Sequence, residues 1–544
     1  MKLKIIQTVI VCLLAITSTQ AQKYLVLLKD KTGTPFSTDK PEAFLSKRAV
    51  ERRLKQRIAI TQRDLPVNPA YVSQIRQTGA KIWFSSRWIN GVLVEASAAQ
   101  LAAIKALACY KGIEFNRSLA NARLSAEKQT SDKFGTEALD YGASQNQILM
   151  LGVDKMHDQG FHGEGMLVGI LDAGFQSSDK NTALNQVFTD KRVLSTFDFV
   201  KNEKSVYEDD SHGNNVFSIM ASNRSGQLIG PAYGASYVLL RTEDAFTENR
   251  VEEANWLFGA EYADSAGVDI INSSLGYNEF DNPADNYTYA DMNGRNTLAA
   301  RAADWAAATG MVVVVSAGNE GNKPWKYIAT PGDADSVLTV GAVASNRTLG
   351  TFSSIGPSSD GRVKPDVCAQ GVSTVLSNPA STTVAGNGTS YSSPLIAGFV
   401  AGFWQAFPYL TALQVIDCIR KAGHLYTTPN AQFGYGIPTF EKAAEVARRD
   451  YPVTSVPVAT LPTPVKVYPN PFSQTPVVLV PQRMVGQTVE VYLIDATGQV
   501  RWQNRPHLSS NQFPLLFSES LPSGLYFLKI ADGLRVEVVK VIKQ

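Results

Sequence analysis

Four polar residues that together could hydrolyse a carbonyl compound lie at the ends of apolar runs in this sequence. Asp172 ends the apolar run of MLVGILDAGF, and His212 opens a helix-like stretch in DDSHGNNVFSIMAS. Asn319 follows four valines in MVVVVSAGNEGN, and Ser390 lies in GTSYSSPLIAGF, where a hydroxyl-rich turn leads into an apolar helix. A serine nucleophile needs a base, a carboxylate that orients the base, and donors for the oxyanion. These four residue types supply that set.

Each residue has a plainer explanation when it is taken alone. Asp and Asn commonly turn or cap a chain, and a lone histidine is more often a surface residue than a base. His212 gains significance because it falls between Asp172 and the serine-rich turn. Ser390 would stand in the first turn of a helix, where the helix dipole and its own N–H favour an oxyanion. We therefore predict that Asp172, His212 and Ser390 are catalytic and that Asn319 contributes to the oxyanion hole.

Two other hydrolase arrangements fit the sequence less well. An esterase with a nucleophile elbow would carry GxSxG, and GTSYSS lacks that motif. A chymotrypsin-like order would use His157 or His162 before Asp172, but the surrounding pattern is α/β and not that of two β-barrels.

The elements that must position these residues belong to an α/β fold. Apolar runs such as SYVLLR, VDIINSSLG and SVLTVGAV alternate with helical stretches, which is typical of a parallel sheet covered by helices on both faces. The carboxyl ends of the strands and the starts of the helices meet at one edge of such a sheet. That edge is where we expect the four residues to converge.

Composition divides the 544 residues into five segments. A basic start, a short apolar core and small residues identify 1–21 as a secretory signal peptide, too short to span a membrane. Residues 22–135 show an α+β pattern, and 136–450 show the α/β pattern. A proline-rich linker covers 451–466, and short alternating strands predict a β-sandwich over 467–544.

Charge and cysteine content restrict the partners. A net charge of +2 gives no reason to expect nucleic acid. The basic run from Lys47 to Arg57 is interpreted as a solvent-exposed helix face and not as an anion site.

Cys368 and Cys418 could form a disulfide in an exported protein, although two small buried hydrophobic residues are the plainer interpretation. No cofactor is required, and no compact acidic loop marks a calcium site.

The order Asp172, His212, Ser390 with an intervening AGNEG resembles the subtilisin-like serine peptidases, or subtilases. The resemblance extends over residues 141–450 and implies a secreted endopeptidase that acts on proteins or peptides through an acyl-enzyme intermediate. By the same resemblance, SSLGY places Ser274, Leu275 and Gly276 along the substrate cleft. A pocket floored near Ala329 would leave room for a large apolar residue before the cut.

Three positions depart from the family's pattern. Ala173 stands where Ser or Thr is usual, Asn215 where a second His is usual, and Tyr391 where Met is usual. None of them belongs to the triad, so we expect activity with an altered rate and specificity. The alternative is a catalytically impaired, subtilase-like surface protein that binds peptides.

The flanking segments resemble domains that accompany secreted peptidases. Residues 22–135 occupy the place of the subtilase propeptide, which implies a zymogen whose N-terminal part assists folding and then blocks the cleft. VYPNPF, VYLIDATGQV and LPSGLYFLKI resemble the sorting domain of the type IX secretion system of Bacteroidota. This implies export to the cell surface or medium, with the type IX machinery as a partner, whereas the alternative is a passive adhesion or carbohydrate-binding sandwich. We expect a monomer.

Overall fold

The computed structural model describes residues 21–120, 140–452, 465–480, 484–517, 521–531 and 536–544. The chain divides into two compact units, Met1–Tyr451 and Pro452–Gln544. The predicted signal peptide up to residue 20, most of the predicted linker and residues 121–135 lie outside the described part. Within the described part, no helix is both long and apolar enough to cross a membrane.

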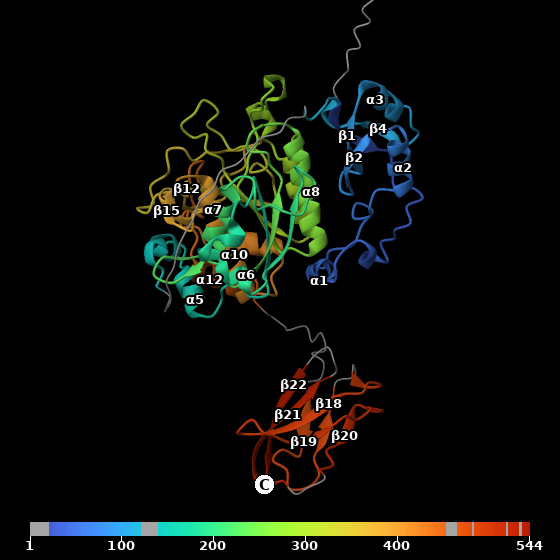
Figure 1. Cartoon of the computed structure of the whole chain (residues 1–544). Helices are drawn as coiled ribbons and strands as arrows, with labels where there is room; N and C mark the ends of the chain where they lie inside the picture. Colours follow the sequence, from blue (N-terminus) through green and yellow to red (C-terminus); the bar gives the residue numbers. More distant parts are fainter. Residues whose placement is uncertain (1–20, 121–139, 453–464, 481–483, 518–520, 532–535) are drawn as a thin grey trace, which may run out of the picture. The chain divides into compact units, whose positions relative to one another are not determined.

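A seven-stranded parallel sheet forms the centre of the first unit (Figure 1). Its order is β13-β12-β11-β10-β5-β9-β6, so that β5 lies between β10 and β9. Every residue of β5, β11 and β12 is buried, which explains why these strands are continuously apolar in sequence. The strands are β5 (Leu167–Asp172), β6 (Val193–Asp198), β9 (Ser236–Arg241), β10 (Ile270–Ser273), β11 (Val312–Ser316), β12 (Val337–Val343) and β13 (Val367–Gln370).

Helices cover both faces of this sheet, and each face has its own core. Val168 and Ile170 of β5 point into the core shared with α7 and α10, whereas Leu167 and Leu171 point into the core shared with α8 and α9. This division follows from the alternation of side chains along a strand. The four helices are α7 (His212–Ala221), α8 (Val251–Ala266), α9 (Leu298–Ala308) and α10 (Thr389–Ala406).

Further helices and hairpins belong to this part of the unit. They are the helices α4 (Gln145–Leu149), α5 (Val153–Asp158), α6 (Asn185–Thr189), α11 (Ala412–Lys421) and α12 (Phe440–Asp450), and two hairpins formed by β7 (Asn223–Arg224) with β8 (Leu228–Ile229) and β14 (Thr374–Ser377) with β15 (Thr383–Gly386).

The N-terminal part of the first unit is a four-stranded antiparallel sheet with the order β2-β3-β1-β4. On one face, Val26 and Val94 pack with Ile75 and Ile104 in a separate core. On the other face, Leu25 and Leu93 join the core that contains α8. The elements are β1 (Gln22–Leu28), α1 (Lys47–Gln56), α2 (Pro69–Gln77), β2 (Lys81–Ser86), β3 (Gly91–Ala96), α3 (Ala98–Lys105) and β4 (Tyr110–Ile113).

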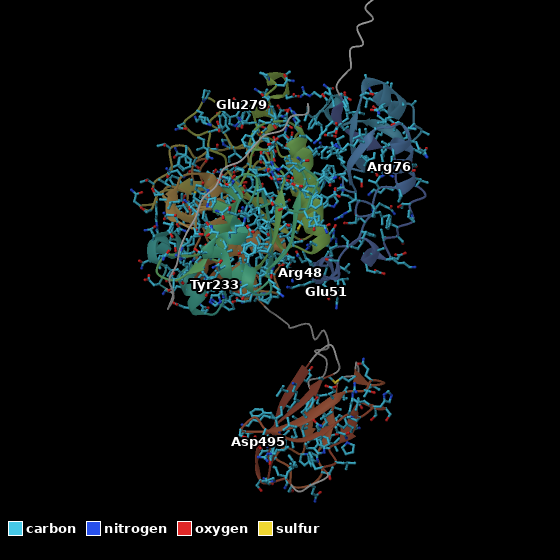
Figure 2. All side chains as sticks on the ribbon, viewed as in Figure 1. Arg48, Glu51, Arg76, Tyr233, Glu279 and Asp495 are labelled. Carbon is cyan, nitrogen blue, oxygen red and sulfur yellow. The ribbon has the colours of Figure 1, made fainter. Side chains whose placement is uncertain are left out.

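The interpretation of the basic run as a solvent-exposed helix face is wrong for two of its residues. Arg52 and Arg53 of α1 are only 5% and 1% exposed. Both guanidinium groups pair with the buried carboxylate of Asp264 on α8, and Arg87 pairs with it as well. Arg48, labelled in Figure 2, pairs with Asp269. The run therefore fastens the N-terminal part to α8, through partners that lie far along the chain.

The second unit consists of two antiparallel sheets that share one core, as expected for a sandwich. The sheets have the orders β16-β17-β20 and β19-β18-β21-β22. Val467 and Val478 of the first sheet pack with Val491 and Leu528 of the second. The strands are β16 (Lys466–Tyr468), β17 (Val477–Leu479), β18 (Glu490–Asp495), β19 (Val500–Asn504), β20 (Gln512–Pro514), β21 (Gly524–Ala531) and β22 (Val536–Lys543).

The described cysteines, Cys109, Cys368 and Cys418, are free and buried. Burial raises the pKa of the Cys368 and Cys418 thiols to about 12, so both stay protonated and uncharged. These two residues are therefore small hydrophobic residues of the core, and the disulfide considered from the sequence is not formed.

Candidate active site

Asp172 and His212 meet at the carboxyl edge of the central sheet. Asp172 is the last residue of β5 and is fully buried, and His212 is the first residue of α7. Asp172 Oδ1 lies 2.7 Å from His212 Nδ1 and also accepts a hydrogen bond from the N–H of Ala173. Gly213 lets α7 begin this close, because a Cβ there would lie 2.3 Å from the Gly174 carbonyl oxygen.

The electrostatics of this pair favour a charged imidazole. Burial opposes the charge, but the carboxylate of Asp172 and its hydrogen bond outweigh burial, so the pKa of His212 is raised above its ordinary value. Asp210 adds to the effect, and its Oδ1 accepts a 2.7 Å hydrogen bond from the N–H of His212. The side chain of His212 is 30% exposed, whereas Asp172 is fully buried.

Ser390 is the second residue of α10, as the sequence predicts for the first turn of a helix. It is 8% exposed, and its Oγ donates a 3.2 Å hydrogen bond to the carbonyl oxygen of Ser274. The Ser390 carbonyl oxygen in turn accepts a 2.9 Å hydrogen bond from Ser274 Oγ. Pro394 has no N–H to donate to that carbonyl within the helix, and the Ser274 hydroxyl takes its place. Ser274 thus holds the start of α10 against the end of β10.

Asn319 lies in the loop after β11 and is attached to the same helix start. Its Oδ1 accepts hydrogen bonds from the N–H of Thr389 at 2.9 Å and from the Thr389 hydroxyl at 3.0 Å. Because the oxygen is held in this way, the amide nitrogen must point elsewhere. Nδ2 lies 3.9 Å from the place where a Cβ at Gly388 would stand, immediately before Thr389 and Ser390.

Two of the three departures from the family pattern contact each other beside His212. The Tyr391 ring stacks on the imidazole with centroids 6.0 Å apart and an angle of 27°. The Tyr391 hydroxyl forms a hydrogen bond with Asn215. The third departure is at Ala173, where no side-chain hydroxyl is available, and Asp172 Oδ2 is buried without a hydrogen-bond partner.

The segment after β10 borders the nucleophile and a small side chain. Leu275 is 8% exposed, Gly276 is exposed, and a Cβ at Gly276 would lie 3.3 Å from the Cβ of Ala329. The N–H of Tyr277 donates to the Thr330 carbonyl oxygen at 2.8 Å, which joins the two loops. Ala329 is thereby placed against the segment that the resemblance assigns to the substrate.

The last described residues of the N-terminal part reach this region. Leu119 is buried, and its carbonyl oxygen accepts a 3.1 Å hydrogen bond from the N–H of Val251, the first residue of α8. Four residues earlier, the Phe115 ring lies 4.6 Å from the guanidinium of Arg250. The segment from Phe115 to Leu119 therefore contacts the start of α8.

The structure brings some of the predicted site residues into direct contact and others only into the same neighbourhood. Asp172 is hydrogen-bonded to His212, and Ser390 is hydrogen-bonded to Ser274. Asn319 is hydrogen-bonded to Thr389, the residue before Ser390. The link between the two groups is Tyr391, which stacks on His212. Sequence patterns missed the contacts of Thr389, Tyr391 and Asn215, because an isolated hydroxyl, phenol or amide carries no signal of its partner.

Three segments of the chain match known families. Residues 163–436 match the Subtilase family, and this range contains Asp172, His212, Asn319 and Ser390. Residues 23–133 match the Peptidase S8 propeptide domain of Bacteroidota, and residues 466–544 match the Secretion system C-terminal sorting domain.

Individual relatives are similar over the same region. Subtilisin DY from Bacillus licheniformis is 32% identical over 301 residues, which cover 55% of this chain and 97% of that protein. Subtilisin NAT from Bacillus subtilis subsp. natto is 30% identical over 313 residues, which cover 57% of this chain and 72% of that protein. The solved structure of MycP1 from the ESX-1 type VII secretion system is 20% identical, with coverage of 59% and 90% and a TM-score of 0.45.

Proposed function

Because this chain belongs to the subtilase family, we propose that it cuts peptide bonds within proteins with a triad of Asp172, His212 and Ser390. Its family and its sorting domain make it a serine peptidase that type IX secretion exports to the cell surface or medium. The observation that supports the triad is the 2.7 Å contact between His212 Nδ1 and the fully buried Asp172 carboxylate, beside the start of α10.

The proposed reaction begins when Ser390 Oγ attacks the carbonyl carbon of the peptide bond. The hydroxyl exchanges its present acceptor, the Ser274 carbonyl oxygen, for His212 Nε2, which takes the proton. The imidazolium that forms is stabilised by Asp172 and returns the proton to the leaving amine. Water then hydrolyses the acyl-enzyme through the same base.

The developing oxyanion would be held by two donors at the start of α10. One is the N–H of Ser390, at the positive end of the helix dipole, and the other is Nδ2 of Asn319. The hydrogen bonds that Asn319 Oδ1 accepts from Thr389 fix the amide in advance, so little reorganisation is needed at the moment of reaction. Replacing Asn319 by Ala should therefore lower kcat by about 10²- to 10³-fold.

The substrate would lie as an extended strand between Ser274–Gly276 and the start of α8. Support comes from Leu119, whose carbonyl already pairs with Val251 N–H as a substrate backbone would. In this position the propeptide domain blocks the cleft until it is removed. The small side chain of Ala329 would leave room for a large apolar residue before the cut, and a peptide library preferring basic or very small residues there would contradict this assignment.

We also propose that the peptidase acts as a monomer, without nucleic acid and without a cofactor in the chemical steps. The near-neutral net charge of +2 supports the second point. The third rests on the fact that serine, histidine and carboxylate groups suffice for acyl transfer.

The experiment that tests the triad is active-site labelling. Ser390→Ala should abolish both labelling of the processed protein by a fluorophosphonate and casein hydrolysis, because the nucleophile is lost. Ser393→Ala is the matched control, since Ser393 lies one turn further along α10 and bonds to Asn272. Labelling that persists in Ser390→Ala would place the nucleophile elsewhere. An unreactive parent protein would favour the alternative, a catalytically impaired surface protein that binds peptides. The observation that favours this alternative is the buried Oδ2 of Asp172, which has no hydrogen-bond partner.

A further inference from the structure

Three glutamate carboxylates meet beside the proposed triad. One oxygen atom from each of Glu243, Glu248 and Glu252 lies within 4.8 Å of the others. Glu243 and Glu252 are 8% and 1% exposed, and Glu248 is partly buried. Among the residues that the structure describes, no Lys or Arg forms an ion pair with any of the three. Buried carboxylates normally have a cationic partner, and these three have none among the described residues.

Other oxygen atoms around the cluster are also unsatisfied. The hydroxyl of Tyr277 is fully buried and has no hydrogen-bond partner, and the same holds for Oε2 of Glu243 and for Oδ1 of Asn255. Burial raises the pKa of Tyr277, and the charges of Glu243, Glu252 and Glu248 nearby raise it further. Buried polar atoms are nearly always paired in native proteins. The unpaired oxygens of Glu243 and of nearby Tyr277 therefore indicate a missing ligand.

The backbone holds the three carboxylates in place. Glu243 follows β9 by two residues, and Glu252 is the second residue of α8. The two oxygens of Glu252 accept hydrogen bonds from the N–H groups of Asp244 and Asn249, at 3.1 and 3.0 Å, and so fold the intervening loop around its side chain. The carbonyl oxygen of Glu248 accepts a 2.9 Å hydrogen bond from the N–H of Asp281. The ligand must accordingly fit a largely fixed set of oxygens.

We propose that Glu243, Glu248 and Glu252 bind one Ca²⁺ ion between the end of β9 and the start of α8. Calcium takes only oxygen ligands, at about 2.3–2.6 Å, so that ligands on opposite sides of the ion stand about 4.6–5.2 Å apart. Three carboxylates in one site suit Ca²⁺, which takes about six to eight oxygen ligands, better than Mg²⁺, which is usually held by one or two carboxylates and keeps several waters. A cavity of about 510 Å³ is lined by Glu252 and by the loop residues Asp244, Thr247 and Asn249.

The ion would stabilise one wall of the cleft without entering the reaction. At one end of the loop, the N–H of Thr242 donates to the carbonyl oxygen of Asp172 at 3.0 Å. At the other end, the N–H of Val251 holds the Leu119 carbonyl, which occupies the position proposed for a substrate backbone. Fixing the loop thus fixes both Asp172 and the strand partner of the substrate.

The test uses the full chain with Ser390→Ala, so that self-digestion does not interfere. CaCl₂ is titrated calorimetrically into protein that has been treated with EDTA and dialysed, and thermal unfolding is followed in EDTA, CaCl₂ and MgCl₂. We expect one Ca²⁺ per chain and a Tm several degrees higher in CaCl₂ than in EDTA, with a smaller effect of MgCl₂.

Variants locate the ion. Glu243→Gln and Glu248→Gln should lose both the binding heat and the calcium-dependent rise in Tm. In EDTA, Glu248→Gln should be at least as stable as its parent, because one repelling charge is gone; this shows that the variant folds. Glu279→Gln is the matched control, since Glu279 is an exposed carboxylate of the same unit that is not in the cluster (Figure 2), and it should bind calcium like the parent.

Three results would overturn the proposal. One is a parent with no binding heat and the same Tm in EDTA and CaCl₂. Another is a calcium response that survives in Glu243→Gln and Glu248→Gln, which would place the ion elsewhere. The third is loss of the calcium-dependent rise in Tm in the control Glu279→Gln as well, which would show that the response does not depend on this cluster. Because Ser390→Ala is used throughout, none of these results depends on the proposed catalytic roles.

Discussion

Asp172 combines full burial with an incomplete set of hydrogen bonds, and this shapes what single substitutions should do. Its Oδ1 is bonded to His212 and to the N–H of Ala173, whereas Oδ2 is buried without a partner. The sequence predicted the carboxylate and the missing hydroxyl at Ala173. It could not predict that Tyr391 and Asn215 contact each other, because those residues lie on different helices and neither has a pattern of its own.

Asp172→Asn should lower kcat/KM on the order of 10⁴-fold, because the imidazole loses its orienting anion. The acid limb of the pH profile should also move. His212 acts as a base only when it is neutral, so the parent loses activity as the pH falls through the raised pKa of His212. Without the Asp172 charge that pKa falls, and the acid limb shifts to lower pH.

Asp210→Asn is the matched control for this shift. Asp210 also raises the pKa of His212, but less than Asp172 does, so the limb should move in the same direction by a smaller amount. The measurement is kcat/KM against pH for the parent and both variants. An acid limb that stays in place in Asp172→Asn would show that His212 is not the titrating base.

Ala173→Ser should stabilise the protein by about 1 kcal/mol, because the new hydroxyl can donate to the unpaired Oδ2 of Asp172. Denaturant unfolding of the Ser390→Ala form measures this without self-digestion. Ala173→Cys adds a similar volume but only a weak donor, and it should give a smaller gain. Equal effects of the two variants would mean that Oδ2 does not need a donor.

At the scale of elements, α8 (Val251–Ala266) performs two tasks. Its first turn provides Val251 and Glu252 to the cleft wall, and its last turns hold the N-terminal part through Asp264. Although burial opposes ionisation, Arg52, Arg87 and Arg53 keep the pKa of Asp264 well below its usual value. The carboxylate is therefore charged at neutral pH.

Asp264→Asn should destabilise the full chain by about 3–5 kcal/mol, because Arg52 and Arg87 would lose their buried anion and Arg53 would keep only Asp64. Asp269→Asn removes a carboxylate that pairs with the partly exposed Arg48, and it should cost about 1 kcal/mol or less. Urea unfolding of both variants in the Ser390→Ala background measures the difference. Similar losses would show that the Asp264 junction adds no stability beyond that of a surface ion pair.

Elements were more predictable than the contacts between them. The strands that end in Asp172 and Ser273 and the helices that begin at His212 and Thr389 agree with apolar runs bounded by turn residues. The burial of Arg53 could not be predicted in this way, because its partner Asp264 is 211 residues away. The glutamate cluster was missed for a similar reason, since EDAFTENRVEE resembles any polar loop until the loop is folded.

At the scale of the whole molecule, the chain separates peptide hydrolysis from export. Each of the two units has its own hydrophobic core, and the match to the Subtilase family ends within the first unit. The sorting domain makes up the second unit from residue 466 onward. The two functions should therefore be separable by truncation.

A chain that ends at Tyr451 should keep its peptidase activity but fail to reach the cell surface or medium. Cell fractionation with an antibody, and casein hydrolysis by the purified protein, measure the two properties independently. The full chain is the control in both assays. Export of the truncated chain at the parent's level would show that the sorting domain is dispensable, and loss of activity in the purified truncated form would show that the first unit depends on the second.

The junction at Asp264 also affects the peptidase once its propeptide domain has been cut away. The released piece carries Arg52, Arg53 and Arg87 with it, and the peptidase keeps an uncovered acid on α8. Opposite charges attract each other over roughly 10 Å at 0.1 M salt and over a shorter distance in stronger brine. Rebinding of the propeptide domain should therefore be faster at low salt than at high salt. If the bound propeptide domain blocks the cleft as proposed, peptidase activity should appear later at low salt than at high salt.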